Sequence, residues 1–165
     1  MIEIRENSPQ IAEALARLGR SAANLAPVMR EIAGIMHHEV EENFAQQGRP
    51  RWLGLKPPVA KRRIGGKILQ DSGQLAASIE PGSDANSAWV GTNKVYAAIH
   101  QFGGKTSPHV IAPRHKKALA FGGRYVKRVQ HPGSNIPARP FLVITASGEE
   151  HILSAVSRYL SKAAG

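Results

Sequence analysis

Histidines and carboxylates gather in one short stretch of the chain, HHEVEE, which runs from His37 to Glu42. A zinc-protease helix requires His-Glu-x-x-His, whereas the last position of this stretch is Glu42. The chain has no cysteine and the stretch has no obvious third ligand. Side chains four residues apart, His37 with Glu41 and His38 with Glu42, would pair on the solvated face of a helix. The stretch therefore predicts surface ion pairs rather than a metal site.

A nucleophilic active site would need a serine or cysteine beside a histidine that a carboxylate orients. Ser72 and Ser78 are near His100 in the sequence, but neither serine stands in a G-x-S-x-G context. The glycine pairs at 65–66, 103–104 and 122–123 lack the spacing of a phosphate-binding loop, so they indicate turns. The residues predict no enzyme, no cofactor and no metal.

Positive charge is concentrated in two central segments. The net charge is +10, and residues 101–141 contain eight Lys and Arg with no Asp or Glu. Residues 49–75 contain seven Lys and Arg against one acidic residue. Such blocks usually have a polyanion nearby, most often nucleic acid, although a merely soluble basic face is the other interpretation.

The basic residues of the second segment surround a predicted β-hairpin. Only Phe121 and Tyr125 are available there to stack on bases, so any nucleic-acid binding would be independent of base sequence. The cations that we expect to face DNA or a partner are Arg114, Lys116, Lys117, Arg124, Lys127 and Arg128.

Two helices are predicted in residues 1–48. Ser8-Pro9 is a good helix start, and Ile11, Leu15 and Leu18 follow at helical spacing. A longer helix begins between 24 and 27 and ends at Gly48, with Glu39, Glu41 and Glu42 turned away from its apolar stripe. That stripe consists of Val28, Ile32, Ile35, Met36, Val40 and Phe44.

The middle of the chain predicts a loop followed by short elements. Residues 49–67 form a basic loop anchored by Trp52, Leu53 and Leu55. Asp71 and Gln74 resemble a capping box that opens a short helix reaching Ile79. After a turn over 81–86, residues 88–92 read as a strand.

The remaining elements are a second short helix, a hairpin and a C-terminal helix. Asn93 would cap a helix over 94–102 that Gly103 ends. Strands over 118–121 and 125–129 enclose Gly122-Gly123, which gives a hairpin at 117–129. Ser147 and Glu150 form a capping box for a helix over 147–163.

This order predicts one α+β domain over residues 1–165, with a helical part at 1–48 and a β-rich part at 68–142. We expect an antiparallel β-sheet with a basic β-hairpin, packed by the long N-terminal helix and the C-terminal helix. No run approaches the ~18–20 apolar residues that a membrane span needs.

Four segments, in order, resemble one known family. They are GRPRWLGL (48–55), ILQDSGQLAASI (68–79), VGTNKVYAAIHQFGG (90–104) and IPARPFL (136–142). Together they resemble the phage virion morphogenesis family, the group of Mu-like and P2-like tail-completion proteins. The residues that carry the resemblance are Trp52, Gly73, Leu75, Tyr96, His100, Gln101, Phe102, Gly103, Pro137, Arg139, Pro140 and Phe141.

We expect these motif residues to report the fold rather than a binding site. Trp52, Tyr96, Ile99, Phe102 and Phe141 are interpreted as packing residues. The prolines of IPARPFL fix an extended run, which leaves Arg139 to bond a neighbouring carboxylate or carbonyl group.

The resemblance implies a non-enzymatic role late in tail assembly, when the finished tail is capped and joined to the DNA-filled head. It also implies kinship with neck and tail-terminator proteins that act as rings, often hexameric. The expected partners are copies of the chain itself, tail-tube and head or neck proteins, and DNA backbone. The protein would then act in the host bacterial cytoplasm during assembly and be part of the virion afterwards. The alternative is a sequence-independent nucleic-acid-binding protein that acts as a free monomer or dimer.

Overall fold

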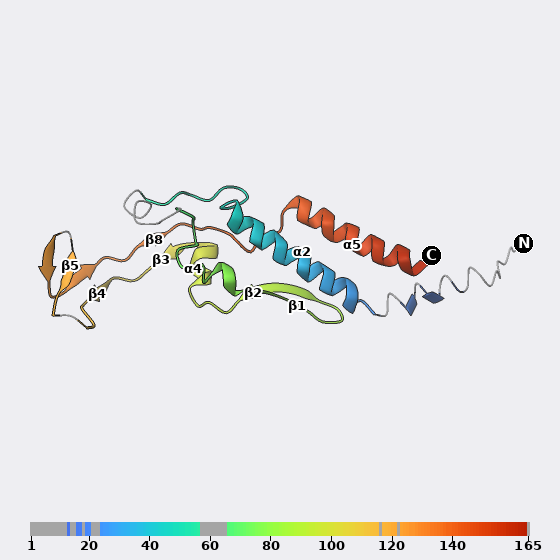
Figure 1. The fold of residues 1–165 in the computed structure, drawn as a ribbon, viewed down its shortest axis with the longest axis horizontal. Helices are drawn as coiled ribbons and strands as arrows, with labels where there is room; N and C mark the ends of the chain where they lie inside the picture. Colours follow the sequence, from blue (N-terminus) through green and yellow to red (C-terminus); the bar gives the residue numbers. More distant parts are fainter. Residues whose placement is uncertain are drawn as a thin grey trace, which may run out of the picture. The chain divides into compact units, whose positions relative to one another are not determined.

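The computed structural model describes residues 24–56, 66–115, 117–121 and 123–164, together with Glu13, Ala16, Arg17, Gly19 and Arg20 (Figure 1). These five N-terminal residues are helical. The helix start predicted at Ser8-Pro9, and the apolar residues predicted to follow it, lie outside the described residues, as does 57–65 of the basic loop. The α+β class with antiparallel strands, a long N-terminal helix and a C-terminal helix is confirmed.

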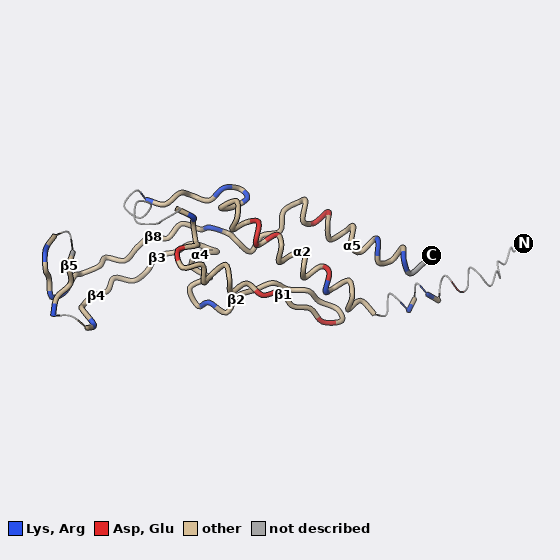
Figure 2. Tube along the Cα trace, viewed as in Figure 1, with Lys and Arg blue, Asp and Glu red and all other residues tan. Residues whose placement is uncertain are grey.

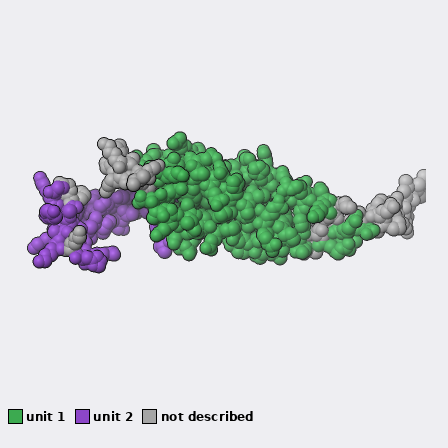
Figure 3. All heavy atoms as spheres, viewed as in Figure 1, with its two compact units in different colours: residues 1–94, 141–165 green, residues 95–140 purple. Residues whose placement is uncertain are grey.

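The chain divides into two compact units, shown in Figure 3. Unit 1 comprises Met1–Lys94 and Phe141–Gly165, and unit 2 comprises Val95–Pro140. Among the described residues, the strands pair two by two, in four separate antiparallel pairs rather than in one larger sheet. One pair belongs to unit 1 and three belong to unit 2.

The central element of unit 1 is helix α2 (Ala26–Ala45), which confirms the long helix predicted from the apolar stripe. After the helix the chain reverses at Gln47 and Gly48, which both have positive φ angles. The Gly48 N–H donates to the Asn43 carbonyl oxygen at 2.8 Å. The stripe residues Val28, Ile32, Val40 and Phe44 are buried. One prediction for this helix is wrong, because Glu39 is 4% exposed and does not face solvent.

Helix α2 lies between a β-hairpin and helix α5 (Figure 1). The hairpin pairs β1 (Ile79–Ser83) with β2 (Ala88–Thr92), and α5 spans Ala146–Ala164. The Phe44 ring contacts Trp52 edge-on with centroids 5.9 Å apart, and it packs against Phe141 at 5.3 Å. Since Phe141 is fully buried, this aromatic cluster forms the centre of the core.

The short helix predicted to open at Asp71 is much shorter in the structure. Only a 3₁₀ turn, η1 (Ala76–Ser78), is present, and it has no side-chain cap. Ile79 already belongs to β1 and pairs with Thr92. The Ser78 hydroxyl bonds both the Leu75 carbonyl oxygen and the Thr92 hydroxyl, so pairing with the next strand overrides the local helix signal.

Two predicted helix caps are also wrong. Helix α4 (Ala97–Phe102) is preceded by Tyr96 without a side-chain cap, and Asn93 lies too far upstream to cap it. Helix α5 is capped by Thr145, whose hydroxyl accepts from the Gly148 N–H at 3.2 Å. The predicted capping residue Ser147 already lies inside α5, because Thr145 is the residue that contacts α2.

Unit 2 consists of α4 followed by three nested antiparallel pairs. The predicted hairpin is confirmed as the last of these pairs, and two further pairs extend it back toward α4. We call residues 104–136 the arm. Its pairs are β3 (Gly104–Lys105) with β8 (Asn135–Ile136), β4 (His109–Ile111) with β7 (Val129–His131), and β5 (Leu119–Phe121) with β6 (Arg124–Val126).

Candidate functional site

The described cations of the arm are exposed. Arg124 is on β6, and Lys127 and Arg128 stand between β6 and β7. Arg114 and Lys117 lie in the connection between β4 and β5, while Lys116 lies outside the described residues. Figure 2 shows the Lys and Arg positions of unit 2 along the arm. The structure thus gathers the five described members of the predicted set on the arm.

No residue of unit 2 can neutralise these cations, because all twelve Asp and Glu residues of the chain belong to unit 1. Unit 2 contains eight Lys and Arg residues. An acid-free surface of this kind attracts a polyanion, or the acidic surface of another protein, from outside the unit.

The described part of the arm has no core of its own. Not one of its described residues is buried, and Val110, Ile111 and Tyr125 are 51%, 38% and 83% exposed. A two-stranded hairpin without a covering layer is at best marginally stable in water. The arm is therefore suited to bind a partner that covers it.

Two histidines pair across the arm. His109 and His131 are opposite each other on β4 and β7, and their rings stack with centroids 4.9 Å apart. The His131 Nδ1 atom accepts from the Gly133 N–H at 3.1 Å. His109 Nδ1 lies 3.0 Å from the Ser107 carbonyl oxygen. These contacts hold both rings, of which His109 is exposed and His131 half-buried, while the nearby His115 is also exposed.

Two of the four family segments, those at 90–104 and 136–142, meet at the base of the arm. The Arg139 N–H donates to the His100 carbonyl oxygen at 2.7 Å, which ties IPARPFL to YAAIHQFGG. Gly103 ends α4 with a φ of 73°, and a Cβ atom there would lie 2.8 Å from the Ala138 nitrogen. The His100 ring packs edge-on against Tyr96 at 6.1 Å. These contacts give the motifs a structural role in closing the arm.

The five predicted packing residues differ in burial, and Ile99 is half-buried. Trp52 and Phe141 are buried, at 6% and 0% exposure, as expected. Tyr96 and Phe102 are 43% and 78% exposed, so the prediction is wrong for them, because the short helix α4 buries only Ala97. Among the other motif residues, Leu75 and Arg139 are buried, Gly73, Gln101 and Pro137 are half-buried, and Pro140 is exposed.

A buried polar network in unit 1 was missed by sequence reasoning. The Thr145 N–H and hydroxyl donate to Glu39 Oε2 at 3.1 and 2.6 Å, and Arg49 Nη2 donates to the same atom at 3.1 Å. Burial raises the pKa of Glu39, but the hydrogen bonds from Thr145 and the Arg49 charge outweigh it and hold that pKa below its usual range. Glu39 therefore stays ionised in the folded protein near neutral pH.

Asn43 extends this network to the segment before α5. Its side-chain amide donates to the carbonyl oxygens of Phe141 and Val143, both at 2.9 Å, and its Oδ1 accepts from Arg49 Nε at 2.9 Å. Gly148 allows the close approach, because a Cβ atom there would lie 2.6 Å from the Glu39 carboxyl carbon. The sequence contains a signal for the burial of Glu39 and Asn43. They follow Ile35, a residue of the predicted apolar stripe, at intervals of four, which places them on the same side of α2.

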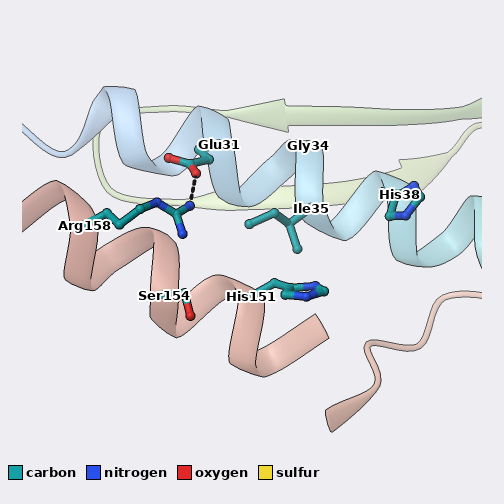
Figure 4. Close-up of a pocket in the computed structure, with 7 residues that line it drawn as sticks. All are labelled: Glu31, Gly34, Ile35, His38, His151, Ser154 and Arg158. Carbon is teal, nitrogen blue, oxygen red and sulfur yellow. Dashed lines mark hydrogen bonds and ion pairs between the residues drawn. The ribbon is translucent and has the colours of Figure 1, made fainter. Parts of the chain in front are cut away.

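The HHEVEE stretch holds a surface pair, as predicted for His37, whose Nδ1 lies 3.8 Å from Glu41 Oε2. His38 instead lines a groove between α2 and α5, together with His151 (Figure 4). Arg158 crosses the groove and bonds Glu31 at 2.6 Å. Within the described part of the chain, no group of three or more His, Asp or Glu side chains is placed to hold a metal ion.

In the described ranges, no helix combines the length and the apolar content that crossing a bilayer requires.

Comparison with known proteins identifies the family. The sequence profile of the phage virion morphogenesis family matches residues 6–161. The chain is 42% identical over 160 residues to Mu-like prophage FluMu G protein 2 of Haemophilus influenzae, covering 96% of both chains. It is 28% identical to the putative capsid assembly protein G of Escherichia phage Mu, covering 93% of this chain and 90% of that protein. No solved structure matches. The chain therefore belongs to the phage virion morphogenesis family, whose members assemble the phage particle.

Proposed function

We propose that this protein completes the phage tail and joins it to the head, acting as a ring of copies whose basic arms reach DNA. It does so without enzymatic activity, as a component of the particle. The observation that carries the proposal is the arm itself, which combines six predicted contact cations with a complete lack of acidic residues. A joint between head and tail is a place where DNA passes through protein, and such an arm suits contact with a phosphate backbone.

The construction of the arm supports a role in contacts rather than in the core. Its three nested pairs have no buried described residue, and its cations are exposed where the structure describes them. The tie between Arg139 and His100 and the turn at Gly103 hold its base. An assembly protein needs this combination of a defined base and a surface that is completed on docking.

A deletion tests the tail-joining role. We expect a phage or induced prophage that lacks this protein to produce separate heads and tails, which electron microscopy of the lysate would reveal. Supplying the protein from a plasmid should restore joined particles. Normal infectious particles from the deletion would contradict the proposal.

The same acid-free arm also favours the second candidate, a free sequence-independent nucleic-acid-binding protein. That candidate predicts salt-sensitive DNA binding by the isolated monomer together with normal particle assembly in the deletion. The tail-joining role predicts the opposite outcome for the particles, so the deletion separates the two functions.

A further inference from the structure

The outward face of hairpin β1–β2 combines an aromatic ring, Trp89, with an acidic side chain, Glu80. The register sets Gly82 opposite Trp89, and Glu80 is two residues before Gly82 on the same face. Trp89 is 50% exposed and Glu80 is exposed, whereas Ile79 on the other face is buried toward α2. Trp89 is therefore not a core residue of unit 1.

The Trp89 indole lies over a glycine. A Cβ atom on Gly82 would come within 2.4, 2.5 and 2.7 Å of Nε1, Cε2 and Cζ2 of the indole. The ring occupies the space that a side chain at Gly82 would fill, which fixes its position on the strand. The half of its surface that stays exposed is a platform on which a cation can stack.

The charged residues of the hairpin itself all have one sign. Residues 79–92 include Glu80 and Asp84 and contain no Lys or Arg. Asp84 accepts the N–H groups of Asn86 and Ser87, each at 2.7 Å, and these bonds hold its pKa below its usual range. Among the described residues, none forms an ion pair or a hydrogen bond with the Glu80 side chain. The hairpin thus offers carboxylates to a cation from outside.

We propose that this hairpin face, Trp89 with Glu80, together with Asp84 of the adjoining turn, is a docking surface for the arm tip (residues 124–128) of a second copy of this chain. The inference rests on the proposed ring of copies and names the surfaces by which copies would contact each other. The arm tip brings Arg124, Lys127 and Arg128, all exposed and without an acidic neighbour in unit 2. One of these cations would stack on the indole while the carboxylates pair its charge, and the remaining cations of the arm would stay available to DNA.

Two features favour a second copy over other occupants of this face. Its carboxylates repel phosphate, so nucleic acid does not bind there. The arm tip and the hairpin face are different surfaces with complementary charge, so each copy offers one of each to its neighbours. Contacts of this head-to-tail kind close into a ring when the rotation between copies allows it.

A charge-exchange experiment tests the docking. Sedimentation velocity at low salt would compare the original chain with a Glu80→Arg variant and with an Arg124→Glu/Arg128→Glu variant. Each variant alone should self-associate at least about tenfold more weakly, because its contact now joins like charges. An equimolar mixture should recover association, since the arginine at 80 then meets the glutamates of the other variant's arm tip.

The matched control is Glu41→Arg, which makes the same change of charge at an exposed position of α2 and should associate like the original chain. Circular dichroism confirms that each variant is folded. A second pair, Trp89→Phe and Trp89→Ala, tests the platform, because Phe keeps a ring over Gly82 but stacks a cation more weakly. Association should fall in the order Trp, Phe, Ala.

Three results with the purified chain alone would overturn the docking proposal. They are no association of the original chain up to about 1 mM protein, unchanged association of the Glu80→Arg variant, and no recovery in the mixture. Recovery only with a tail or head protein added would assign the face to that other partner and overturn it as well. The deletion test stays independent, since separate heads and tails with unchanged Glu80→Arg association would refute the docking alone.

Discussion

The two units of this protein use charge in opposite ways. In unit 1, Glu39, Arg49 and Thr145 are brought together and satisfy one another beside a buried aromatic cluster. In unit 2, the cations of the arm have no acidic partner in their own unit and no core beneath them. Buried and paired charges fix a fold, whereas exposed charges of one sign remain available to a partner. From this difference we expect unit 1 to supply the stability of the fold and the arm to supply the contacts with a partner.

The largest effect on stability is expected from the aromatic core of unit 1. Phe141→Ala removes a fully buried ring that packs against Phe44 at 5.3 Å, and it should lower the free energy of unfolding by about 3–5 kcal/mol. Tyr125→Ala in the arm, where the side chain is 83% exposed, should cost less than about 0.5 kcal/mol. Urea unfolding followed by circular dichroism measures the free energy of unfolding of both variants. Equal losses would contradict the view that the core of unit 1, and not the arm, stabilises the fold.

A smaller loss is expected from the polar network. Asn43→Ala leaves the carbonyl oxygens of Phe141 and Val143 without their amide donor, and it should cost about 2–3 kcal/mol. Gln46→Ala is the control, because its side chain makes only an exposed bond to Glu42 and its loss should cost about 0–0.5 kcal/mol. The same urea titration applies, and similar values for the two variants would show that the network does not stabilise unit 1.

The pH dependence of stability isolates Glu39. The pKa of Glu39 is lower in the folded protein than its ordinary value of 4.5, so the ionised carboxylate stabilises the fold above that pH. This contribution is lost as the pH falls below 4.5 toward the folded pKa. Glu39→Gln should cost about 1–2 kcal/mol at pH 7, and its difference from the original chain should shrink in acid. Urea titrations from pH 7 to 3 check this, with Glu41→Gln as control.

A constant difference across that pH range would mean that the charge of Glu39 contributes nothing. The control residue Glu41 is 61% exposed, so its substitution should leave the pH profile almost unchanged.

The smallest effect on stability, and the largest on binding, is expected from the arm cations. Replacing Arg124, Lys127 and Arg128 with Gln should change the free energy of unfolding by less than about 0.5 kcal/mol. The slope of log K against log salt for duplex DNA should fall by up to about 0.9 per charge removed. Fluorescence anisotropy with labelled DNA measures the slope, and an unchanged slope would remove these residues from the contact.

Local sequence patterns predicted the elements whose own residues have a helical or strand spacing. Helix α2 follows from its apolar spacing and the reversal at Gly48, and strand β2 has the predicted bounds. The exposure of Arg124, Lys127 and Arg128 follows from a segment too rich in charge to be buried. The family resemblance rested on four ordered motifs, and two of them, at 90–104 and 136–142, meet at the base of the arm.

The features that sequence patterns did not predict depend on contacts between residues far apart in the chain. Glu39 is buried because it bonds Thr145, which is 106 residues away. The same bond places the cap of α5 at Thr145 rather than at Ser147. Pairing with β2 draws Ile79 into a strand despite the helix signals before it. The arm is longer than its predicted hairpin because β3 and β4 are too short to give a periodic pattern.

The central claim, that the arm acts in joining while unit 1 supplies the fold, is tested most directly by complementation. A deletion phage would be supplied with the original protein or with the Arg124→Gln/Lys127→Gln/Arg128→Gln variant, and the fraction of heads joined to tails would be counted by electron microscopy. The account predicts that the original protein restores joined particles, while the variant folds normally but leaves heads and tails apart. Full restoration of joined particles by the folded variant would contradict it.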